Sequence, residues 1–174
     1  MTQTAPSSRL AAYDAAFARD MQALQLANIS VIITALSGGP DSSALACLAD
    51  RYARSRGAAH HAIIVNHNIR SDATDEAGRV RQRMQARAIA TQIVTVQDKA
   101  PSTGIQEWAR HQRFAALTKQ ARQQRAVLLL AHHQADQAET VLMRLARGSG
   151  IAGLAGMRGL THCDAVPVAR PVLN

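Results

Sequence analysis

Cysteine, aromatic side chains and long apolar runs are all scarce in this sequence of 174 residues. Its two cysteines, Cys47 and Cys163, form no Cys-x-x-Cys pair, so a redox or metal site of that kind is not expected and a reducing cytoplasm is predicted. No apolar run reaches the roughly 18 residues of a membrane-spanning helix. Residues 1–9 are polar and lack the apolar core of a signal peptide.

Lysine is scarce as well, because Lys99 and Lys119 are the only lysines among the 20 basic side chains. With 12 acidic side chains the formal net charge is +8, and an excess of arginine suits a polyanionic partner such as nucleic acid. An arginine-rich proteome would give the same composition, so the charge alone leaves both explanations open. The length and the 47% hydrophobic content are typical of one α/β domain with its own core.

The chain is organised around a glycine-rich turn. A β-branched apolar run at residues 29–36 precedes it and predicts a buried parallel strand, and the apolar segment from Ala44 predicts a helix. In such a strand–turn–helix, glycines, successive backbone N–H groups and the helix N-terminus together form an anion site. A well-capped connection would use the same residues. The turn comprises Ser37, Gly38, Gly39, Pro40, Asp41, Ser42 and Ser43.

Asp41 is unusual in an anion site, because a carboxylate repels phosphate. It fits as a helix cap, or as a ligand of Mg²⁺ held between it and the phosphates. The turn lacks the lysine of a Walker loop and the spacing of the dinucleotide fingerprint. At every fixed position it resembles the PP-loop signature Ser-Gly-Gly-x-Asp-Ser of the ATP pyrophosphatases. The resemblance implies that ATP is bound through its phosphates by the turn residues, with Mg²⁺ at Asp41.

Four apolar segments alternate with helical patterns. This alternation predicts an α/β fold, a parallel twisted sheet with helices on both faces. The PP-loop resemblance implies that this fold is Rossmann-like and similar to that of the adenine nucleotide alpha hydrolases. Residues 166–174 contain Pro167 and Pro171 and are expected to form extended edge structure. The expected strands are 29–36, 61–66, 91–96 and 126–131, and the expected helices are 10–26, 44–56, 74–90, 104–125 and 136–147.

Polar residues follow the second expected strand, at the edge where open α/β sheets bind ligands. Arg70 is able to reach a phosphate or an adenine face, and His67 is able to donate to a leaving group. A solvated loop with a hydrogen-bonded histidine would explain both residues equally well. The arginines of residues 71–90 are most simply a solvated helix face.

Arg110 and Arg113 lie near the start of the fourth expected helix and on one side of it. Cations in this position oppose the helix macrodipole, so an anionic ligand would explain why they are there. An intrahelical ion pair between Arg110 and Glu107 is the competing explanation.

Asp136 and Glu139 are three residues apart at the start of the last expected helix and share a face. They are expected to form either a two-carboxylate site for an ammonium group or Mg²⁺, or a capping box, since Asp-x-x-Glu has that pattern. The adjacent His132 and His133 do not predict a metal site, because neighbouring side chains on an extended segment point to opposite faces.

Together these motifs resemble, in order and spacing, the family of tRNA(Ile)-lysidine synthetase. The resemblance covers roughly residues 29–173. Asn68-Ile69 departs from the usual Gly-Leu, and Ala135 from an acid or asparagine, whereas Asp136 matches. Besides the PP-loop, the matching stretches are 65–70, 104–110, 131–140, 144–150, 153–157 and 170–171.

The resemblance implies a two-step ligation. ATP transfers AMP to the position-2 carbonyl oxygen of the wobble cytidine in tRNA(Ile) with a CAU anticodon, and free L-lysine then displaces AMP to give lysidine. Residues 1–174 would be one PP-loop catalytic domain, without the C-terminal tRNA-binding domains usual in the family. The implied catalytic residues are Asp41, His67, Arg110, Asp136 and Glu139, and the implied ATP contacts are the PP-loop residues and Arg70.

Two other functions stay open. A tRNA 2-thiolation enzyme of the same superfamily commonly carries lysine where Pro40 stands, together with paired cysteines, and this sequence has neither. A non-catalytic nucleotide- or RNA-binding module would explain the charge and the PP-loop. Such a module would not explain the combination of Asp136, Glu139 and Arg110.

Overall fold

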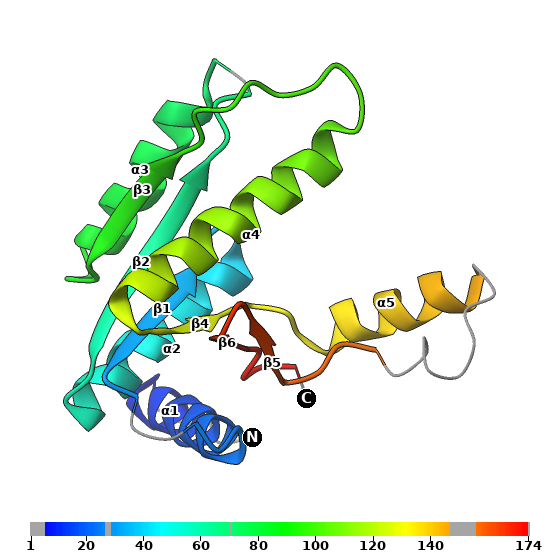
Figure 1. Ribbon diagram of the computed structural model, residues 1–174. Helices are drawn as coiled ribbons and strands as arrows, with labels where there is room; N and C mark the ends of the chain where they lie inside the picture. Colours follow the sequence, from blue (N-terminus) through cyan, green and yellow to red (C-terminus); the bar gives the residue numbers. More distant parts are fainter. Residues whose placement is uncertain (1–5, 27–28, 70, 147–155, 174) are drawn as a thin grey trace.

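The computed structural model describes residues 6–26, 29–69, 71–146 and 156–173. They form a six-stranded sheet in the order β3-β2-β1-β4-β6-β5, in which only β5 runs antiparallel to its neighbour (Figure 1). The strands are β1 Val31–Ala35, β2 Ala59–Asn66, β3 Thr91–Thr95, β4 Val127–Leu129, β5 Leu160–Cys163 and β6 Val166–Ala169. The helices are α1 Pro6–Ala23, α2 Pro40–Arg56, α3 Ala73–Gln85, α4 Ile105–Gln124 and α5 Gln134–Ala146.

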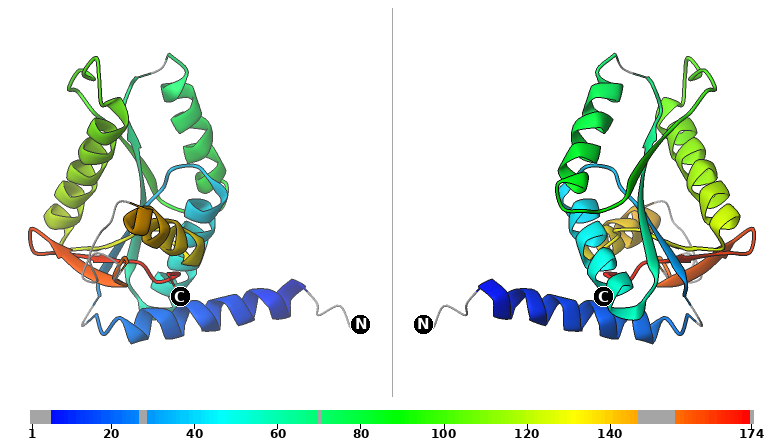
Figure 2. Two further views of the ribbon diagram at one scale, coloured as in Figure 1. Left: turned by 90° about the vertical axis from the view of Figure 1, so that its right-hand side faces the viewer. Right: turned by 90° about the vertical axis from the view of Figure 1, so that its left-hand side faces the viewer.

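Helices cover both faces of the sheet, which confirms the predicted α/β fold (Figure 2). Successive residues of β1 point to opposite faces. Ile32 packs in one cluster with Phe17 of α1 and Leu45 of α2, whereas Ile33 packs in another with Leu117 of α4. On the α2 side, α3 extends the cover over β2 and β3 through residues such as Val80. The core of the domain is therefore two apolar layers, one on each side of the sheet.

The order of the strands reverses between β1 and β4. From β1 the chain proceeds outward through β2 to β3, and β4 then pairs with the other side of β1. In open α/β sheets, ligands bind outside the carboxyl ends of the strands at such a switch point. The PP-loop follows β1 and residues 132–136 follow β4. The topology therefore places these two motifs at one position on the sheet edge.

The carboxyl-terminal strands differ from the prediction. β6 is not edge structure: it lies between β4 and β5, and β5 forms the edge. The hairpin turn consists of Asp164 and Ala165, whose φ values are 48° and 66°. A two-residue turn with both φ values positive is a favoured hairpin connection, but it is usually signalled by Asn-Gly or Asp-Gly. Because glycine is absent here, the hairpin was not predicted.

The helix boundaries are close to those expected, with two shifts that matter. α3 ends at Gln85, well before residue 90, and α5 begins at Gln134 rather than at Asp136. Among the described residues, no helix is both long and apolar enough to span a membrane.

Candidate functional site

The serines of the PP-loop hold the loop in shape. The backbone N–H and the hydroxyl of Ser37 donate to Ser42 Oγ, at 3.2 and 3.0 Å, and the Ser42 hydroxyl donates to the carbonyl of Gly39 at 3.1 Å. The Ser43 hydroxyl donates to the same carbonyl at 2.8 Å. Because these hydroxyls are used within the loop, the groups offered to a ligand are chiefly the backbone N–H groups at the start of α2.

The two glycines of the PP-loop meet different demands. Gly38 has a φ of 89°, and an added Cβ would lie 2.7 Å from Cγ2 of Val80 on α3. Gly39, the N-cap of α2, has an ordinary φ of −70°, and an added Cβ would meet only Ser37 Oγ, at 3.8 Å. The fold therefore requires Gly38, whereas Gly39 leaves open space over the loop.

His133 connects the PP-loop with the start of α5. Its Nε2 lies 3.7 Å from Oδ2 of Asp41, and its Nδ1 lies 3.5 Å from Oδ2 of Asp136. The backbone N–H of His133 also donates to Asp136 Oδ2 at 2.9 Å. The structure thus brings together two of the predicted catalytic carboxylates. The sequence did not single out His133 for this position, because its only signal was an adjacent histidine pair.

The capping-box prediction for Asp136 and Glu139 was wrong in register. α5 begins at Gln134, so Asp136 is the third residue of the helix, and its carboxylate accepts from the N–H of His133 just before the helix. Glu139 lies one turn further along and is exposed, with no hydrogen bond or ion pair to the described residues. Helix capping therefore accounts for Asp136 but not for Glu139.

Arg110 lies on α4, and its charge affects His132 and Arg170 at the same edge of the sheet. Within the described part of the chain it forms no ion pair with Glu107. Burial lowers the pKa of Arg170, and the charge of Arg110 lowers it further. Arg170 donates to His132 Nδ1 at 3.3 Å, and burial followed by the Arg170 charge lowers the pKa of His132. A neutral histidine and two interacting guanidinium groups thus lie at the carboxyl ends of β4 and β6, where they favour an anion.

His67 lies just after β2, beside Trp108 of α4, with the two ring centroids 6.2 Å apart. Both of its ring nitrogens are buried and lack a hydrogen-bond partner among the described residues. Burial, and secondly the charge of Arg113, lowers the pKa of His67. Asn68 and Ile69 of this loop are exposed, as the alternative expected, but the described residues give His67 no hydrogen bond. Arg70, the other residue predicted here, lies outside the described residues.

Asn68 occupies a left-handed position, with a φ of 50°. The backbone N–H of Asn68 donates a hydrogen bond to Oδ1 of Asn66 at 2.9 Å, which stabilises this conformation. Asparagine is one of the few residues with a side chain that visits this conformation readily. Asn68 therefore adopts, in this chain, a backbone conformation that glycine also adopts readily.

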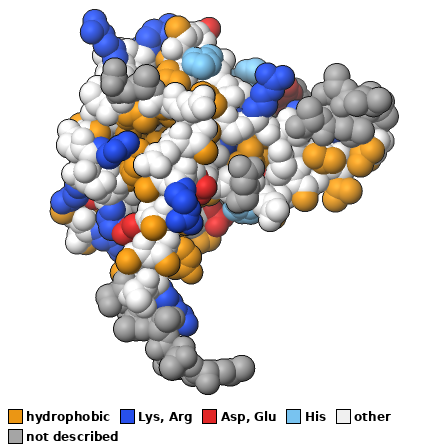
Figure 3. All heavy atoms as spheres, turned by 90° about the horizontal axis from the view of Figure 1, so that it is seen from below, with side chains coloured by type: hydrophobic (Ala, Val, Ile, Leu, Met, Phe, Trp, Pro, Cys, Tyr) orange, Lys and Arg blue, Asp and Glu red, His pale blue; other side chains and the backbone are white. Residues whose placement is uncertain are grey.

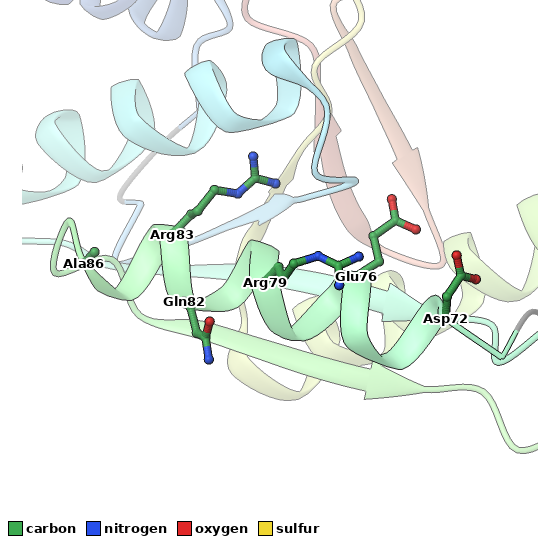
Figure 4. A pocket seen from close by; sticks show the side chains of 6 residues that line it. All are labelled: Asp72, Glu76, Arg79, Gln82, Arg83 and Ala86. Atoms are coloured by element: carbon green, nitrogen blue, oxygen red, sulfur yellow. The ribbon is translucent and has the colours of Figure 1, made fainter.

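A shallow groove of about 880 Å³ runs along α3 (Figure 4). Figure 4 shows Glu76 and Arg83 extending to one side of the helix and Gln82 to the other. The lining carries charges of both signs and does not form a uniform cationic surface. This mixture favours the interpretation of the α3 arginines as a solvated helix face. The lining residues are Asp72, Glu76, Arg79, Gln82, Arg83 and Ala86.

The described residues contain no group of three or more His, Cys, Asp or Glu side chains able to hold a metal ion. Asp41 offers one carboxylate, 61% exposed, at the N-terminus of α2. Mg²⁺ typically binds one or two carboxylates together with substrate phosphates and water. Asp41 therefore fits Mg²⁺ when ATP supplies further oxygen ligands.

The sequence has many curated relatives that are named tRNA(Ile)-lysidine synthase. It is 40% identical over 153 residues to the protein from Bradyrhizobium diazoefficiens, covering 86% of this chain and 42% of that protein. It is 44% identical over 146 residues to the protein from Rhodopseudomonas palustris, covering 82% of this chain and 42% of that protein. The chain thus spans less than half the length of these relatives.

A solved structure supports the fold. The U34-tRNA thiolase NcsA from Methanococcus maripaludis, with its [4Fe-4S] cluster, superposes with a TM-score of 0.78 at 20% identity, covering 98% of this chain and 61% of that one. Residues 13–174 match the family described as the PP-loop domain, which is an ATP-binding domain. With the PP-loop at the end of β1, in the geometry described above, this chain belongs to the PP-loop domain family.

Proposed function

We propose that this chain is the ATP-binding catalytic part of a tRNA(Ile)-lysidine synthase that works in the cytoplasm. The observation that carries the proposal is the position of His133 between Asp41 of the PP-loop and Asp136 of α5. It supports a reaction with two adjacent halves, one that needs a phosphate site and one that needs carboxylates for a cationic substrate. The names of the relatives support tRNA(Ile) as one substrate. Free L-lysine as the second substrate is part of this proposal.

In the first half, the position-2 carbonyl oxygen of the wobble cytidine attacks the α-phosphorus of ATP. A bond forms between that oxygen and phosphorus, the bond to the bridging oxygen of the β-phosphate breaks, and pyrophosphate leaves. The backbone N–H groups of the PP-loop bind the departing charge, and Arg110 and Arg170 add positive charge from the other side. Mg²⁺ held by Asp41 and the phosphates would neutralise part of the same charge.

In the second half, Asp136 and Glu139 bind the ε-ammonium group of free L-lysine. A proton leaves this group to Asp136 or His133, and the neutral amine attacks carbon 2 of the cytidine. The carbon–oxygen bond then breaks, and AMP departs with that oxygen. His67 is neutral, so its N–H is able to donate a hydrogen bond to the departing phosphate. The CAU anticodon and the assignment of Arg70 to ATP belong to this proposal as predictions.

The thiolation alternative has less support. Thiolation enzymes of this superfamily commonly use paired cysteines. Here Cys47 packs on the α2–α3 side of the sheet, whereas Cys163 packs on the α4 side. The two thiols therefore lie on opposite faces and do not form a pair.

The direct test is nucleoside analysis of tRNA(Ile) after incubation of the full-length protein with ATP and lysine. We expect lysidine at the wobble position, and AMP and pyrophosphate in equal amounts. Asp136→Asn and Glu139→Gln should each lower lysine incorporation by roughly 100-fold, while adenylation of tRNA survives. Sulfur in the product would support thiolation instead. Normal lysine incorporation in both variants would remove the carboxylates from the mechanism.

A further inference from the structure

α5 is attached to the domain in an unusual way, because none of its residues is buried. Leu142 and Leu145 are 65% and 52% exposed, and Figure 3 shows hydrophobic side chains gathered on the protruding part of the molecule that α5 forms. Most helices of a globular domain are fixed by an apolar face packed on the core. Within the described part of the chain, α5 is instead held by polar contacts at a few points.

The strongest of these contacts is made by Gln137. Its Nε2 donates to the carbonyl of Met157 at 2.9 Å, and its Oε1 accepts from the N–H of Met157 at 2.6 Å. The side-chain amide therefore pairs with one backbone unit in both directions, as a neighbouring strand would. Seven residues further along the same face of α5, Arg144 Nη1 donates to the carbonyl of Gly156 at 3.3 Å.

Gly156 gives the amide of Gln137 the space it needs. Its φ is 66°, and an added Cβ would lie 2.7, 2.8 and 2.9 Å from Nε2, Cδ and Oε1 of Gln137. Any side chain at this position would press on the amide plane itself. The pairing therefore depends on the glycine as well as on the glutamine.

We propose that Gln137 is a positioning residue for the lysine-dependent half of the reaction. It follows Asp136 directly and lies two residues before Glu139, so it fixes the turn of α5 that carries both carboxylates. Without it, the helix would retain the bond from His133 N–H to Asp136 and the bond from Arg144 to Gly156 but would be held less firmly between them. Of the two carboxylates, Glu139 would then move more, because Asp136 is still held by His133. This proposal rests on the proposed function, in which these carboxylates bind the lysine ammonium.

Gln137→Ala in the full-length protein removes both hydrogen bonds and tests the proposal. We expect faster hydrogen exchange at the Met157 amide and a KM for lysine raised roughly 10- to 100-fold, with ATP-dependent adenylation of tRNA unchanged. Gln134→Ala is the matched control, because Gln134 is an exposed residue in the same turn, and it should alter none of these quantities.

Gln137→Glu gives a second readout that a general loss of stability would not produce. The introduced carboxylate still accepts from Met157 N–H but repels the Met157 carbonyl, whereas a protonated carboxyl donates to it. The KM for lysine, relative to the unmodified protein at each pH, should therefore improve as the pH is lowered. Gly156→Ala should also raise the KM for lysine, because its Cβ would clash with the Gln137 amide. In a protein that already carries Gln137→Ala this amide is absent, so Gly156→Ala should raise the KM less.

The outcomes separate this proposal from the proposed function. If Asp136→Asn lowers lysine incorporation while Gln137→Ala leaves the lysine KM unchanged, the positioning proposal is overturned and the function stands. If neither Asp136→Asn nor Glu139→Gln lowers lysine incorporation, the carboxylates have no part in the mechanism and the positioning proposal is overturned, while the function stands. If the unmodified full-length protein makes no lysidine, the proposed function fails and the positioning proposal with it. A raised lysine KM with an unchanged Met157 exchange rate also overturns the proposal, because Gln137 would then act without the contact.

Discussion

The PP-loop packs against α3 through Gly38 and Val80 and is closed by hydrogen bonds of its own serines, whereas α5 has no buried residue and is attached by polar contacts. The two segments nevertheless flank the same position on the sheet edge and meet at His133. The contrast teaches that the phosphate half of the site is built into the core of the fold. The segment that carries Asp136 and Glu139 has no buried residue and is held at a few points.

The largest effect on stability is expected from Gly38→Ala, because Gly38 is the point at which the PP-loop packs against α3. The new Cβ would meet Val80 at 2.7 Å in a backbone conformation that side chains disfavour. Overpacking and left-handed strain together should lower the free energy of unfolding by about 3 kcal/mol. Urea denaturation measures this loss. Gly39→Ala is the control and should cost far less, so equal losses in the two variants would contradict the distinction between the glycines.

Gly39→Val should weaken ATP binding while leaving the stability of the fold almost unchanged. Its side chain would occupy open space over the loop, where the backbone is expected to approach the phosphates. Calorimetry should show ATP affinity lowered at least tenfold, or about 1.4 kcal/mol, with a melting temperature close to that of the unmodified protein. Unchanged ATP binding would mean that the phosphates do not lie against Gly39.

Acidification should lower the free energy of unfolding of the domain through His60, which is buried in β2 beside the strand that leads into the PP-loop. Its Nε2 lies 3.0 Å from Thr34 Oγ1, and burial lowers its pKa although the hydrogen bond to Asp50 opposes this. A histidine with a lowered pKa in the fold binds its proton more readily when unfolded. The contribution of neutral, buried His60 to stability is therefore fully present above the ordinary pKa of about 6.5 and is lost as the pH falls below it.

We expect His60 to contribute to a loss of stability between pH 7 and pH 5.5, because the unfolded chain binds the proton first. Urea denaturation at several pH values measures this dependence. His60→Gln should be less stable at pH 7 but should show a flatter pH profile. An identical profile in both proteins would assign the dependence to other histidines.

The smallest effect is expected on α5. Replacing Leu142 and Leu145 together by glutamine should change the free energy of unfolding of this domain by less than about 0.5 kcal/mol, because both side chains are already exposed. The measurement is again urea denaturation. A loss of several kcal/mol would show that these leucines are covered in solution, and the contrast between the two halves of the site would then disappear.

Much of the site was predictable because its signals are local. The apolar run, the glycine turn and the helix that follows predicted the PP-loop. The strand order that places residues 132–139 beside it was seen only in the structure. Asp136 was identified, but its cap was assigned to the wrong register because the pattern Asp-x-x-Glu does not specify the first residue of the helix. His133 was set aside because side-chain alternation on an extended segment excludes a shared metal. It does not exclude contacts to Asp41 on one side and Asp136 on the other.

The sequence by itself determined the α/β class, the PP-loop and the chemistry that the loop offers, since each depends on residues that are neighbours in the chain. Only the tertiary structure decided that Gly38 rather than Gly39 is fixed by packing, that β6 lies inside the sheet, and that His133 joins the two halves of the site. It also decided that the side-chain amide of Gln137 pairs with the backbone of Met157. The physical reason is that each of these depends on two segments distant in sequence, and their contact is created by the order in which the strands assemble.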